Sequence, residues 1–377
     1  MVSYTDIHLE QSRDVNQLLK SCEADAIDNI VKMSNDSNSD APVRTATKGP
    51  PSHTRVIDRR YNHQLALRPS KLAPIIVSTQ AAEFINGSTE AETHVRKLVE
   101  DLKSTSPGTA RQATSEIRHL SREMGNRILI ASCGAISPLI VLLYSSDLAT
   151  QEYAVTALLN LSINDNNKIA ISNAEVVESL IHVLQTGTPE AKENAAATLY
   201  SLSTYKENKI QIGNSGAITP LVELLGSGTP RGRKDAANAL FNLSTCTENK
   251  AGIVKSGAVK HLVDLMDPAT GMVDRAIVIL ANLATIQEGR IAIAEAGGIP
   301  LLVEAIELGS PRGKENAAAA LWHLCLNSNR CSKMVLDQGA GPPLVALTKS
   351  GTTRAKEKAN KLIDHLRRLQ RNYARRG

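Results

Sequence analysis

The stretch that predicts the fold is residues 207–247, which read ENKIQIGNSGAITPLVELLGSGTPRGRKDAANALFNLSTCT. It holds an Asn-Lys pair, a turn at Gly216, an apolar stripe over 218–225, a Gly/Pro-rich break and a last segment around Asn242. The same order recurs along the chain, and the Asn242 position is occupied in turn by His119, Asn160, Ser201, Asn242, Asn282, His323 and His365. The steps of 41, 41, 41, 40, 41 and 42 residues match the period of helical repeats that stack into a solenoid.

Each repeat is expected to contain three helices. A short first helix begins near the Asn-Lys pair, and glycine at 134, 216, 257, 297 or 339 permits the turn into the second, because glycine reaches positive φ without strain. Ala174 replaces that glycine in one repeat. The third helix follows Pro189, Pro230 or Pro311, which preset the first helical turn. Full repeats are expected at about 125–165, 166–206, 207–247, 248–287, 288–328 and 329–370.

Aliphatic side chains are expected to build the core, since only 3% of the residues are aromatic. Along the third helices an apolar face repeats, with leucines four and seven positions after Ala154, Ala195, Ala236, Ala276 and Ala317. Such small residues let neighbouring helices approach closely. We therefore expect an all-α, right-handed superhelix over 90–370, made of a partial first repeat and about six more, with the third helices lining its concave side.

The two ends of the chain depart from this pattern. Residues 1–89 combine a weak amphipathic stretch, which predicts short helices, with polar sequence that is expected to be flexible. The net charge of +5 is concentrated near the C-terminus, where nine Lys or Arg lie between Arg354 and Arg376. The basic tail 371–377 is interpreted as a solvated helix end, with a nuclear address or a phosphate-binding tail as alternatives.

The spacing of the cysteines and the length of the apolar runs indicate the cellular compartment of the protein. Five scattered cysteines without a Cys-x-x-Cys pair indicate reduced thiols. The first residues lack an apolar core of signal-peptide length, and no run approaches 18 apolar residues. These features favour a soluble protein of the cytoplasm, with the nucleus as a second compartment.

The candidate site is a polar face of the third helices. Counted from the Asn242 position, residues at −4, −7 and −11 lie within about 40° of it on a helix of 3.6 residues per turn. This face is mixed in charge, and we expect it to bind an extended peptide or a folded domain of a protein partner. The candidate residues are Tyr153, Thr156, Asn160, Asn194, Ser201, Asp235, Asn238, Asn242, Arg275, Asn282, Asn316 and His323.

Two roles are open for the recurring asparagines, and they do not exclude each other. An asparagine amide can donate to and accept from the peptide groups of an extended chain, which favours binding in the groove. Alternatively, Asn160, Asn242 and Asn282 tie neighbouring helices or loops together. Partner binding and thermal stability of their alanine variants would separate the two roles.

Other chemistry is not indicated by the sequence. The histidines lack metal-ligand spacing, and those at 119, 323 and 365 are interpreted as surface substitutes for the asparagine. The breaks at 228–233 and 309–314 do not match the phosphate-loop pattern and are interpreted as turns, and Trp322 is expected to pack rather than to bind a ligand. We expect no catalytic residues, metal ion, cofactor or small-molecule substrate, and the nearly neutral remainder of the chain disfavours nucleic acid.

Several phrases resemble the armadillo-repeat domain of plant U-box ubiquitin ligases. They are ALLNLSINDNNK at 157–168, GTPRG at 228–232 with KDAA at 234–237, GMVD at 271–274 and GSPRGKENAA at 309–318. The similarity covers roughly 90–370. It implies an armadillo array that holds substrates or receptor-kinase partners, while a U-box in those proteins recruits the ubiquitin-conjugating enzyme.

The U-box itself is not recognised in residues 1–89. A U-box is expected to open on a Cys-Pro-Ile phrase, and this region holds only Cys22, followed by Glu23. The expected function is a protein-binding adaptor in ubiquitination or signalling. The first alternative is a ubiquitin-protein ligase of the U-box/armadillo type whose U-box is missing or divergent here, and the second is a nuclear-import or cytoskeletal adaptor.

Nuclear import is disfavoured by a comparison with importin-α, another armadillo family. Importin-α pairs each groove asparagine with a tryptophan four residues earlier. Here those positions hold Thr156, Ala197, Asn238, Val278 and Ala319. A cargo lysine would therefore lack the aromatic walls that attract it.

Overall fold

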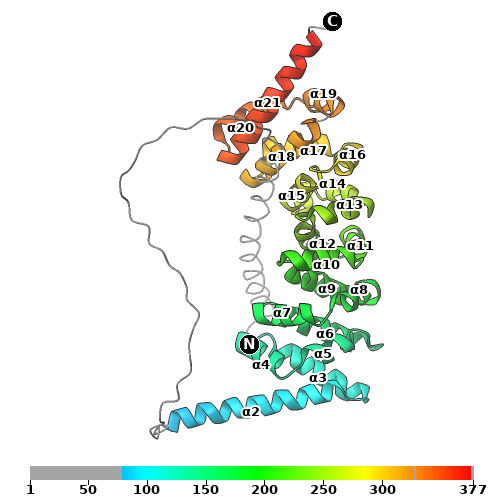
Figure 1. The fold of residues 1–377 in the computed structure, drawn as a ribbon, viewed down its shortest axis with the longest axis vertical. Helices are drawn as coiled ribbons and strands as arrows, with labels where there is room; N and C mark the ends of the chain where they lie inside the picture. The colour runs from blue at the N-terminus through cyan, green and yellow to red at the C-terminus, as the bar shows by residue number, and fades with distance from the viewer. Residues whose placement is uncertain (1–78, 327, 375–377) are drawn as a thin grey trace, which may run out of the picture.

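The structure is a computed structural model that describes residues 79–326 and 328–374. These residues form a stack of helices that runs in chain order from one end to the other (Figure 1). The first pair is α2 (Thr79–Leu102) and α3 (Pro107–Leu120). Residues 1–78, which include most of the region expected to be flexible and its predicted short helices, lie outside the described residues, as do 375–377 of the basic tail.

Three-helix units follow this pair. The first two are α4 (Met124–Ser132), α5 (Ile136–Leu142) and α6 (Leu148–Leu161), then α7 (Asp165–Asn173), α8 (Val177–Thr186) and α9 (Pro189–Leu202). The next two are α10 (Lys206–Asn214), α11 (Ile218–Ser227) and α12 (Pro230–Ser244), then α13 (Thr247–Lys255), α14 (Ala258–Asp264), the 3-10 helix η2 (Pro268–Thr270) and α15 (Val273–Leu283). The last two are α16 (Gln287–Glu295), α17 (Gly298–Leu308) and α18 (Pro311–Leu326), then α19 (Asn329–Asp337), α20 (Gly341–Ser350) and α21 (Thr353–Ala374).

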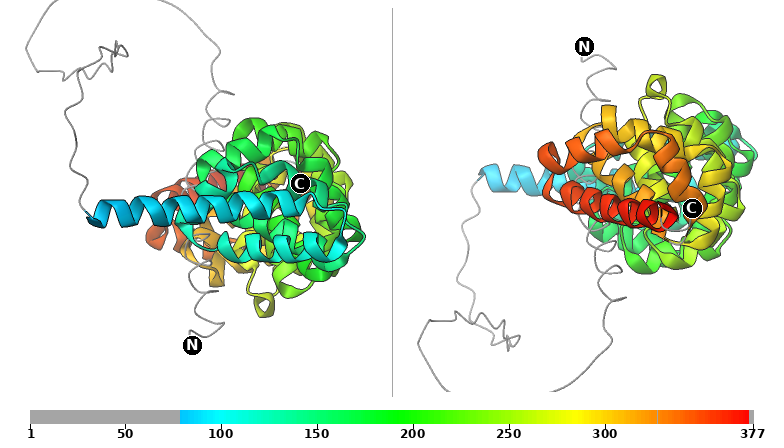
Figure 2. Two further views of the ribbon diagram at one scale, coloured as in Figure 1. Left: turned by 90° about the horizontal axis from the view of Figure 1, so that it is seen from below. Right: turned by 90° about the horizontal axis from the view of Figure 1, so that it is seen from above.

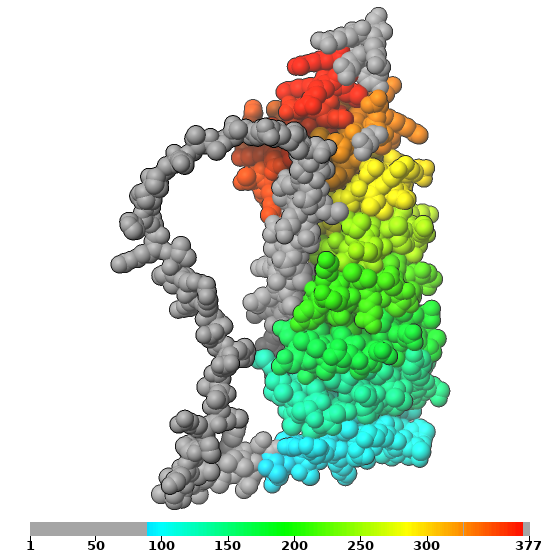
Figure 3. Space-filling model, viewed as in Figure 1, coloured from blue at the N-terminus to red at the C-terminus, as the bar shows by residue number. Residues whose placement is uncertain are grey.

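Each three-helix unit begins within one residue of the repeat start expected from the sequence. The prediction of an all-α, right-handed superhelix of such units is confirmed. In Figure 1 the third helices α15 and α18 lie towards the side onto which α20 projects, and the second helices α8 and α11 lie on the opposite side. The space-filling view shows the units as continuous layers along the stack (Figure 3).

The first helix is longer than expected. α2 begins at Thr79, ahead of the expected start at 90, and projects from the stack when the stack is viewed along its long axis (Figure 2). α21 continues to Ala374, into the stretch 371–377 that was interpreted as a solvated helix end. Leu362 and Leu366 anchor this helix in the core. Once a helix is nucleated by packing, each further residue adds a hydrogen bond at little cost, so α21 runs past its packed part.

A residue in the left-handed region joins the first helix to the second in every three-helix unit. Five are the expected glycines at 134, 216, 257, 297 and 339, with φ between 73° and 89°. In the remaining unit this residue is Glu175, with φ 55°, whereas Ala174 keeps φ −84°. The expectation that Ala174 takes the place of the glycine is wrong by one residue. The chain must still turn there, and Glu175 adopts the strained conformation.

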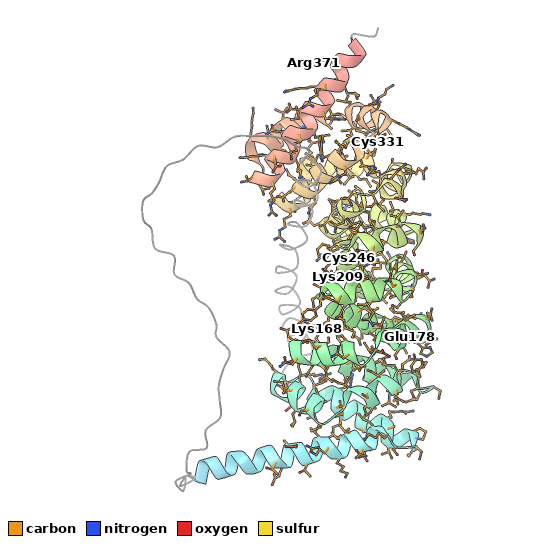
Figure 4. All side chains as sticks on the ribbon, viewed as in Figure 1. Lys168, Glu178, Lys209, Cys246, Cys331 and Arg371 are labelled. Atoms are coloured by element: carbon orange, nitrogen blue, oxygen red, sulfur yellow. The ribbon has the colours of Figure 1, made fainter. Side chains whose placement is uncertain are left out.

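The Asn-Lys pair of the repeat has a structural role. Asn249 Nδ2 donates to a carbonyl at the end of α12 at 3.2 Å and to the Lys209 carbonyl of the preceding first helix at 2.9 Å. Lys250 is 2% exposed, and its Nζ donates to Thr285 Oγ1, just beyond the end of α15, at 2.8 Å. The equivalent Lys168 and Lys209 follow each other along the stack (Figure 4). Because cations are favourable near helix C-termini, the pair stabilises the ends of the third helices.

The third helices begin and pack as expected. Proline starts α9, α12 and α18, and the hydroxyls of Thr188 and Thr229 accept from backbone N–H groups of the first turn at 3.1 and 3.0 Å. The predicted core alanines of these helices, and the leucines four and seven positions later, are at most 1% exposed. The third helices of successive units therefore pack on one another along the stack. This packing fixes which face of each third helix is turned to its neighbours.

Candidate protein-interaction surface

The asparagines of the recurring position are buried between third helices. Asn160, Asn242 and Asn282 are 3%, 1% and 2% exposed. Each amide nitrogen donates to a serine hydroxyl at the end of the preceding third helix, at 3.1, 3.0 and 2.9 Å; these acceptors are Ser121, Ser203 and Ser244. Ser201, at the same position, donates to a carbonyl of the preceding repeat at 3.0 Å. These bonds correspond to the structural role considered above, because they tie neighbouring repeats together.

His323 occupies the recurring position without such a bond. The residue that ends the preceding third helix is Ala284, which has no hydroxyl. The Nε2 atom of His323 is buried and has no hydrogen-bond partner within 79–326 and 328–374. Burial, followed by the charges of Lys358, Lys250 and Arg290, lowers the pKa of His323 to about 4. This histidine is partly buried rather than fully exposed at the surface, and its low pKa keeps the imidazole neutral near pH 7.

Three further candidates take part in contacts that cross α6, α9 and α12. Asn194 Nδ2 donates to Thr156 Oγ1 at 2.8 Å, and Asn194 Oδ1 accepts from Arg231 Nη2 at 2.7 Å. The ring of Tyr153 lies beneath the guanidinium of Arg118, whose Cζ is 4.4 Å from the ring centroid. Much of the hydrogen-bonding capacity of these side chains is therefore used inside the solenoid.

Asp235 belongs to a cluster of charges on α9 and α12. Its carboxylate lies 3.6 Å from Arg231 Nε, which also lies 3.5 Å from a carboxylate oxygen of Glu193. Burial raises the pKa of Asp235 to about 6, Arg231 opposes the rise, and the negative charge of Glu193 adds to it. Asp235 is thus a carboxyl group that titrates in the mildly acidic range.

The remaining candidates, Asn238, Arg275 and Asn316, line one pocket of about 870 Å³. Asn238 is 2% exposed and Asn316 is 8% exposed. No side-chain hydrogen bond reaches either amide from the part of the chain that the structure describes. The guanidinium of Arg275 stacks on Phe241, with Cζ 4.6 Å from the ring centroid. Two largely buried residues, whose amides are not fully enclosed, therefore line the same open space.

This pocket is bordered by α12, the connection 265–272, α15, α17 and α18. Its charged lining residues are Lys234, Asp274, Arg275, Glu304 and Arg312. Its apolar lining includes Met266, Met272, Val273, Val278, Leu301 and Leu308. A lining that combines apolar side chains with polar and charged groups is typical of a binding pocket.

Sequence reasoning missed Lys234 and Met272, although a signal was present. The position eight residues before the recurring one carries Arg111, Glu152, Glu193, Lys234, Asp274, Glu315 and Glu357. A lysine thus interrupts a run of acids, at the place where the repeat step shortens from 41 to 40 residues. The connection 265–272, which contains η2, lies in the same unit.

Several other features bear on chemistry. In the described residues, no group of three or more His, Cys, Asp or Glu side chains is arranged to hold a metal ion, and Cys133, Cys246, Cys325 and Cys331 are free thiols. Trp322 packs edge-on against His365, with ring centroids 5.9 Å apart, in line with the packing role expected for it. No single helix of the described ranges is long and apolar enough to cross a membrane; by length and composition alone, α4 and α5 pass together as a pair bent by 89°.

Comparison with known sequences finds matches over the same region of the chain that the three-helix units occupy. The family model described as the plant U-box protein ARM repeat region matches residues 94–373. U-box domain-containing protein 4 of Arabidopsis thaliana is 69% identical over 282 residues, which are 74% of this chain and 34% of that protein. U-box domain-containing protein 2 of the same organism is 66% identical over 251 residues, 66% of this chain and 36% of that protein. The chain spans about a third of the length of these relatives.

Solved structures share the fold. An engineered protein matches with a TM-score of 0.65 and 27% identity, over 76% of this chain and 70% of its own. A chain from a structure on the interaction between cadherin and β-catenin matches with a TM-score of 0.66 and 22% identity, over 76% of this chain and 58% of its own. A designed armadillo repeat protein in complex with the peptide (KR)4 matches with a TM-score of 0.54 and 22% identity, over 61% of this chain and 99% of its own. The last two identities are low, so these two matches establish the fold alone.

Proposed function

Because the chain belongs to the plant U-box proteins through their ARM repeat region, we propose that it is a protein-binding adaptor whose third helices hold a segment of a partner protein. The observation that carries this proposal is the pair Asn238 and Asn316, two largely buried residues whose amides make no hydrogen bond to residues 79–326 and 328–374 and border one pocket. Neither amide is sealed from solvent, so a partner in the pocket can reach both. The main chain of an extended segment offers the N–H and C=O groups that both amides lack.

Two solved structures of the same fold support binding as the role of such an array. One is a designed armadillo protein in complex with a peptide, and the other concerns the interaction between cadherin and β-catenin. In the present chain, the network on α6, α9 and α12 and the bonded asparagines hold the third helices in place. The pocket between α12 and α18 then offers preformed polar groups to a partner, and preformed groups lower the ordering cost of binding.

The adaptor role is tested by affinity capture from plant extract with the full chain. Asn238→Ala combined with Asn316→Ala is expected to lose a discrete set of the proteins that the wild type captures, at an unchanged melting temperature, because neither amide makes a hydrogen bond to residues 79–326 and 328–374. Lys260→Ala, an exposed position on the second helix α14 outside the pocket, is the matched control and is expected to keep them. If the wild type and the double variant capture the same proteins, this result would contradict binding at this face.

The names of the relatives support a place in ubiquitination or signalling, with the armadillo repeats supplying recognition. We propose the cytoplasm as the site of action, with the nucleus as a second compartment, which a fluorescent fusion would show. The alternative is a ubiquitin-protein ligase. Purified chain, ubiquitin, activating enzyme and a panel of conjugating enzymes distinguish the two: we expect no ubiquitin chains beyond those formed without this protein, and chain formation that depends on it would favour the ligase.

A further inference from the structure

Besides the bonds of the recurring position (that of Asn242), a second series of contacts links the third helices near their N-terminal ends, and we call this series the ladder. In it, the side chain eight residues before the recurring position pairs with the residue that caps the next third helix. The pairs are Arg111–Asp147, Glu152–Thr188, Glu193–Thr229, Asp274–Ser310 and Glu315–Thr352. Each of these pairs closes the space between two neighbouring helix ends.

This ladder is interrupted between α12 and α15. Lys234 stands where the neighbouring repeats have a carboxylate, and Met272, which precedes α15, makes no side-chain capping bond. The connection before Met272 contains the 3-10 helix η2. Lys234 is exposed and forms no ion pair or hydrogen bond with any residue in 79–326 and 328–374. The pocket of about 870 Å³ lies at this interruption.

The charges around the pocket favour a negative ligand. Lys234, Arg275 and Arg312 line it, against Asp274 and Glu304. The two carboxylate oxygens of Asp274 already accept from the hydroxyl of Ser310 at 2.9 and 2.8 Å, as part of the ladder. A carboxylate that entered beside Lys234 would meet an exposed ammonium that forms no ion pair within the described ranges, although Asp235 lies within its electrostatic reach. The apolar part of the pocket lining strengthens such an attraction.

The two buried amides set the length and the conformation of the ligand. Asn238 lies on α12 and Asn316 on α18, with α15 between them. Packed helices lie about 8–10 Å apart, so the two amides are separated by roughly 16–20 Å. An extended chain rises about 3.3 Å per residue, so a segment of about five or six residues reaches from one amide to the other.

We propose that this pocket, between α12, α15 and α18, binds an extended acidic segment of a partner protein. An Asp or Glu side chain of the segment pairs with Lys234, its main chain bonds to Asn238 and Asn316, and a neighbouring apolar side chain enters the lining near Met272 and Val278. The inference rests on the proposed protein-binding function and adds to it the place, the charge and the length of the bound segment.

The probe is a phage library of random peptides of about 12 residues, twice the expected span, selected against the immobilised full chain. Enriched peptides are then synthesised with a fluorophore and titrated by fluorescence polarisation. We expect peptides with acidic residues next to an apolar one. Lys234→Glu is expected to weaken their binding about tenfold or more, since it opposes like charges in a partly desolvated site. Lys260→Glu, the same charge change outside the pocket, is expected to alter it less than about twofold.

Asn238→Ala provides a second and independent variant, because it removes an unbonded amide and leaves every charge in place. It is expected to weaken the same peptides while circular dichroism and melting temperature stay unchanged. Acidic peptides that bind both variants as tightly as the wild type would overturn the assignment to this pocket and leave the adaptor role standing. Enriched peptides that are basic or neutral would overturn the charge class. A library that yields no binding peptide would contradict both the inference and the proposed peptide-binding face.

Discussion

Asn238 and Asn242 lie one turn apart on α12, and both are buried, yet they are used differently. Asn242 donates to Ser203 Oγ at 3.0 Å and to the Tyr200 carbonyl at 3.3 Å, so it joins α12 to α9. Asn238 makes no side-chain hydrogen bond within the described ranges and lines the pocket. The residue type and its burial are the same, and the difference comes from what the neighbouring helix presents. The comparison separates an asparagine that holds the solenoid together from one that is available to a partner.

The largest expected effect separates these two asparagines by stability. Asn242→Ala removes two buried hydrogen bonds between α9 and α12, so the free energy of unfolding should fall by about 2–3 kcal/mol. Asn238→Ala removes no bond and introduces a better helix former, so its change should stay within about 0.5 kcal/mol. Urea denaturation followed by circular dichroism measures both. Equal losses in the two variants would remove the distinction drawn here.

A second test uses His323, the partly buried residue of the recurring position whose Nε2 has no hydrogen-bond partner among the described residues. Its folded pKa of about 4 lies below the ordinary value of 6.5, so the unfolded chain binds the proton first as the pH falls. The stability that the neutral imidazole allows is present above about pH 6.5 and is lost towards pH 4. The free energy of unfolding of His323→Asn, taken relative to that of the wild type, should therefore rise by about 2 kcal/mol when the pH falls from 7 to 5. Denaturation curves at the two pH values measure this, and a constant difference would argue against a buried, neutral His323.

Asp235 should show the opposite pH dependence and a smaller effect. Its folded pKa of about 6 lies above the ordinary value of 3.8, so the folded protein binds the proton first. Stability from protonation is present at low pH and is lost as the pH rises through about 6. Asp235→Asn imitates the protonated form, so its advantage over the wild type should shrink by about 1 kcal/mol from pH 7 to pH 5. An advantage that grows on acidification would mean that the ion pair with Arg231 outweighs burial.

The smallest effect concerns the turn at Glu175, where five other units have glycine. A side chain in the left-handed region costs about 1 kcal/mol, which the flexibility of glycine in the unfolded chain offsets in part. Glu175→Gly should raise the free energy of unfolding by about 0.5–1 kcal/mol. The melting temperature of the variant checks this, with Ala174→Gly as the control that is expected to destabilise, because Ala174 is not in the left-handed region. A stabilising Ala174→Gly would restore the expectation made from the sequence.

Most of the fold was predictable because the signals that carry it are local and repeated. The steps of 40–42 residues, the glycines at the turns and the prolines at the starts of α9, α12 and α18 each depend on backbone conformation at one place. The turn at Glu175 was placed one residue too early, although the step of 41 residues forward from Gly134 and back from Gly216 leads to Glu175. The start of α2 was misplaced because helix ends are set by packing and propagation rather than by a single residue.

The candidate site was predictable as a face but not residue by residue. Helical periodicity grouped the twelve candidates correctly on the third helices, and three of them, Asn238, Arg275 and Asn316, line the pocket. It could not show that Asn160 or Asn194 is already bonded, since their partners lie 39 and 38 residues away in the chain. It also overlooked Lys234, although the run of acids that this lysine interrupts can be read from the sequence; the structure adds that these acids pair with the residues that cap the next third helices.

The sequence by itself determined the repeat, the all-α class, the positions of most turns and the apolar faces that stack, because these follow from spacing and from the conformational preferences of single residues. Only the tertiary structure decided which polar side chains remain available. A hydrogen bond between repeats depends on two residues about forty positions apart and on the exact approach of two helices. Ser203 meets Asn242 through that approach, Ala284 leaves His323 without a partner, and the break at Lys234 opens a pocket beside Asn238.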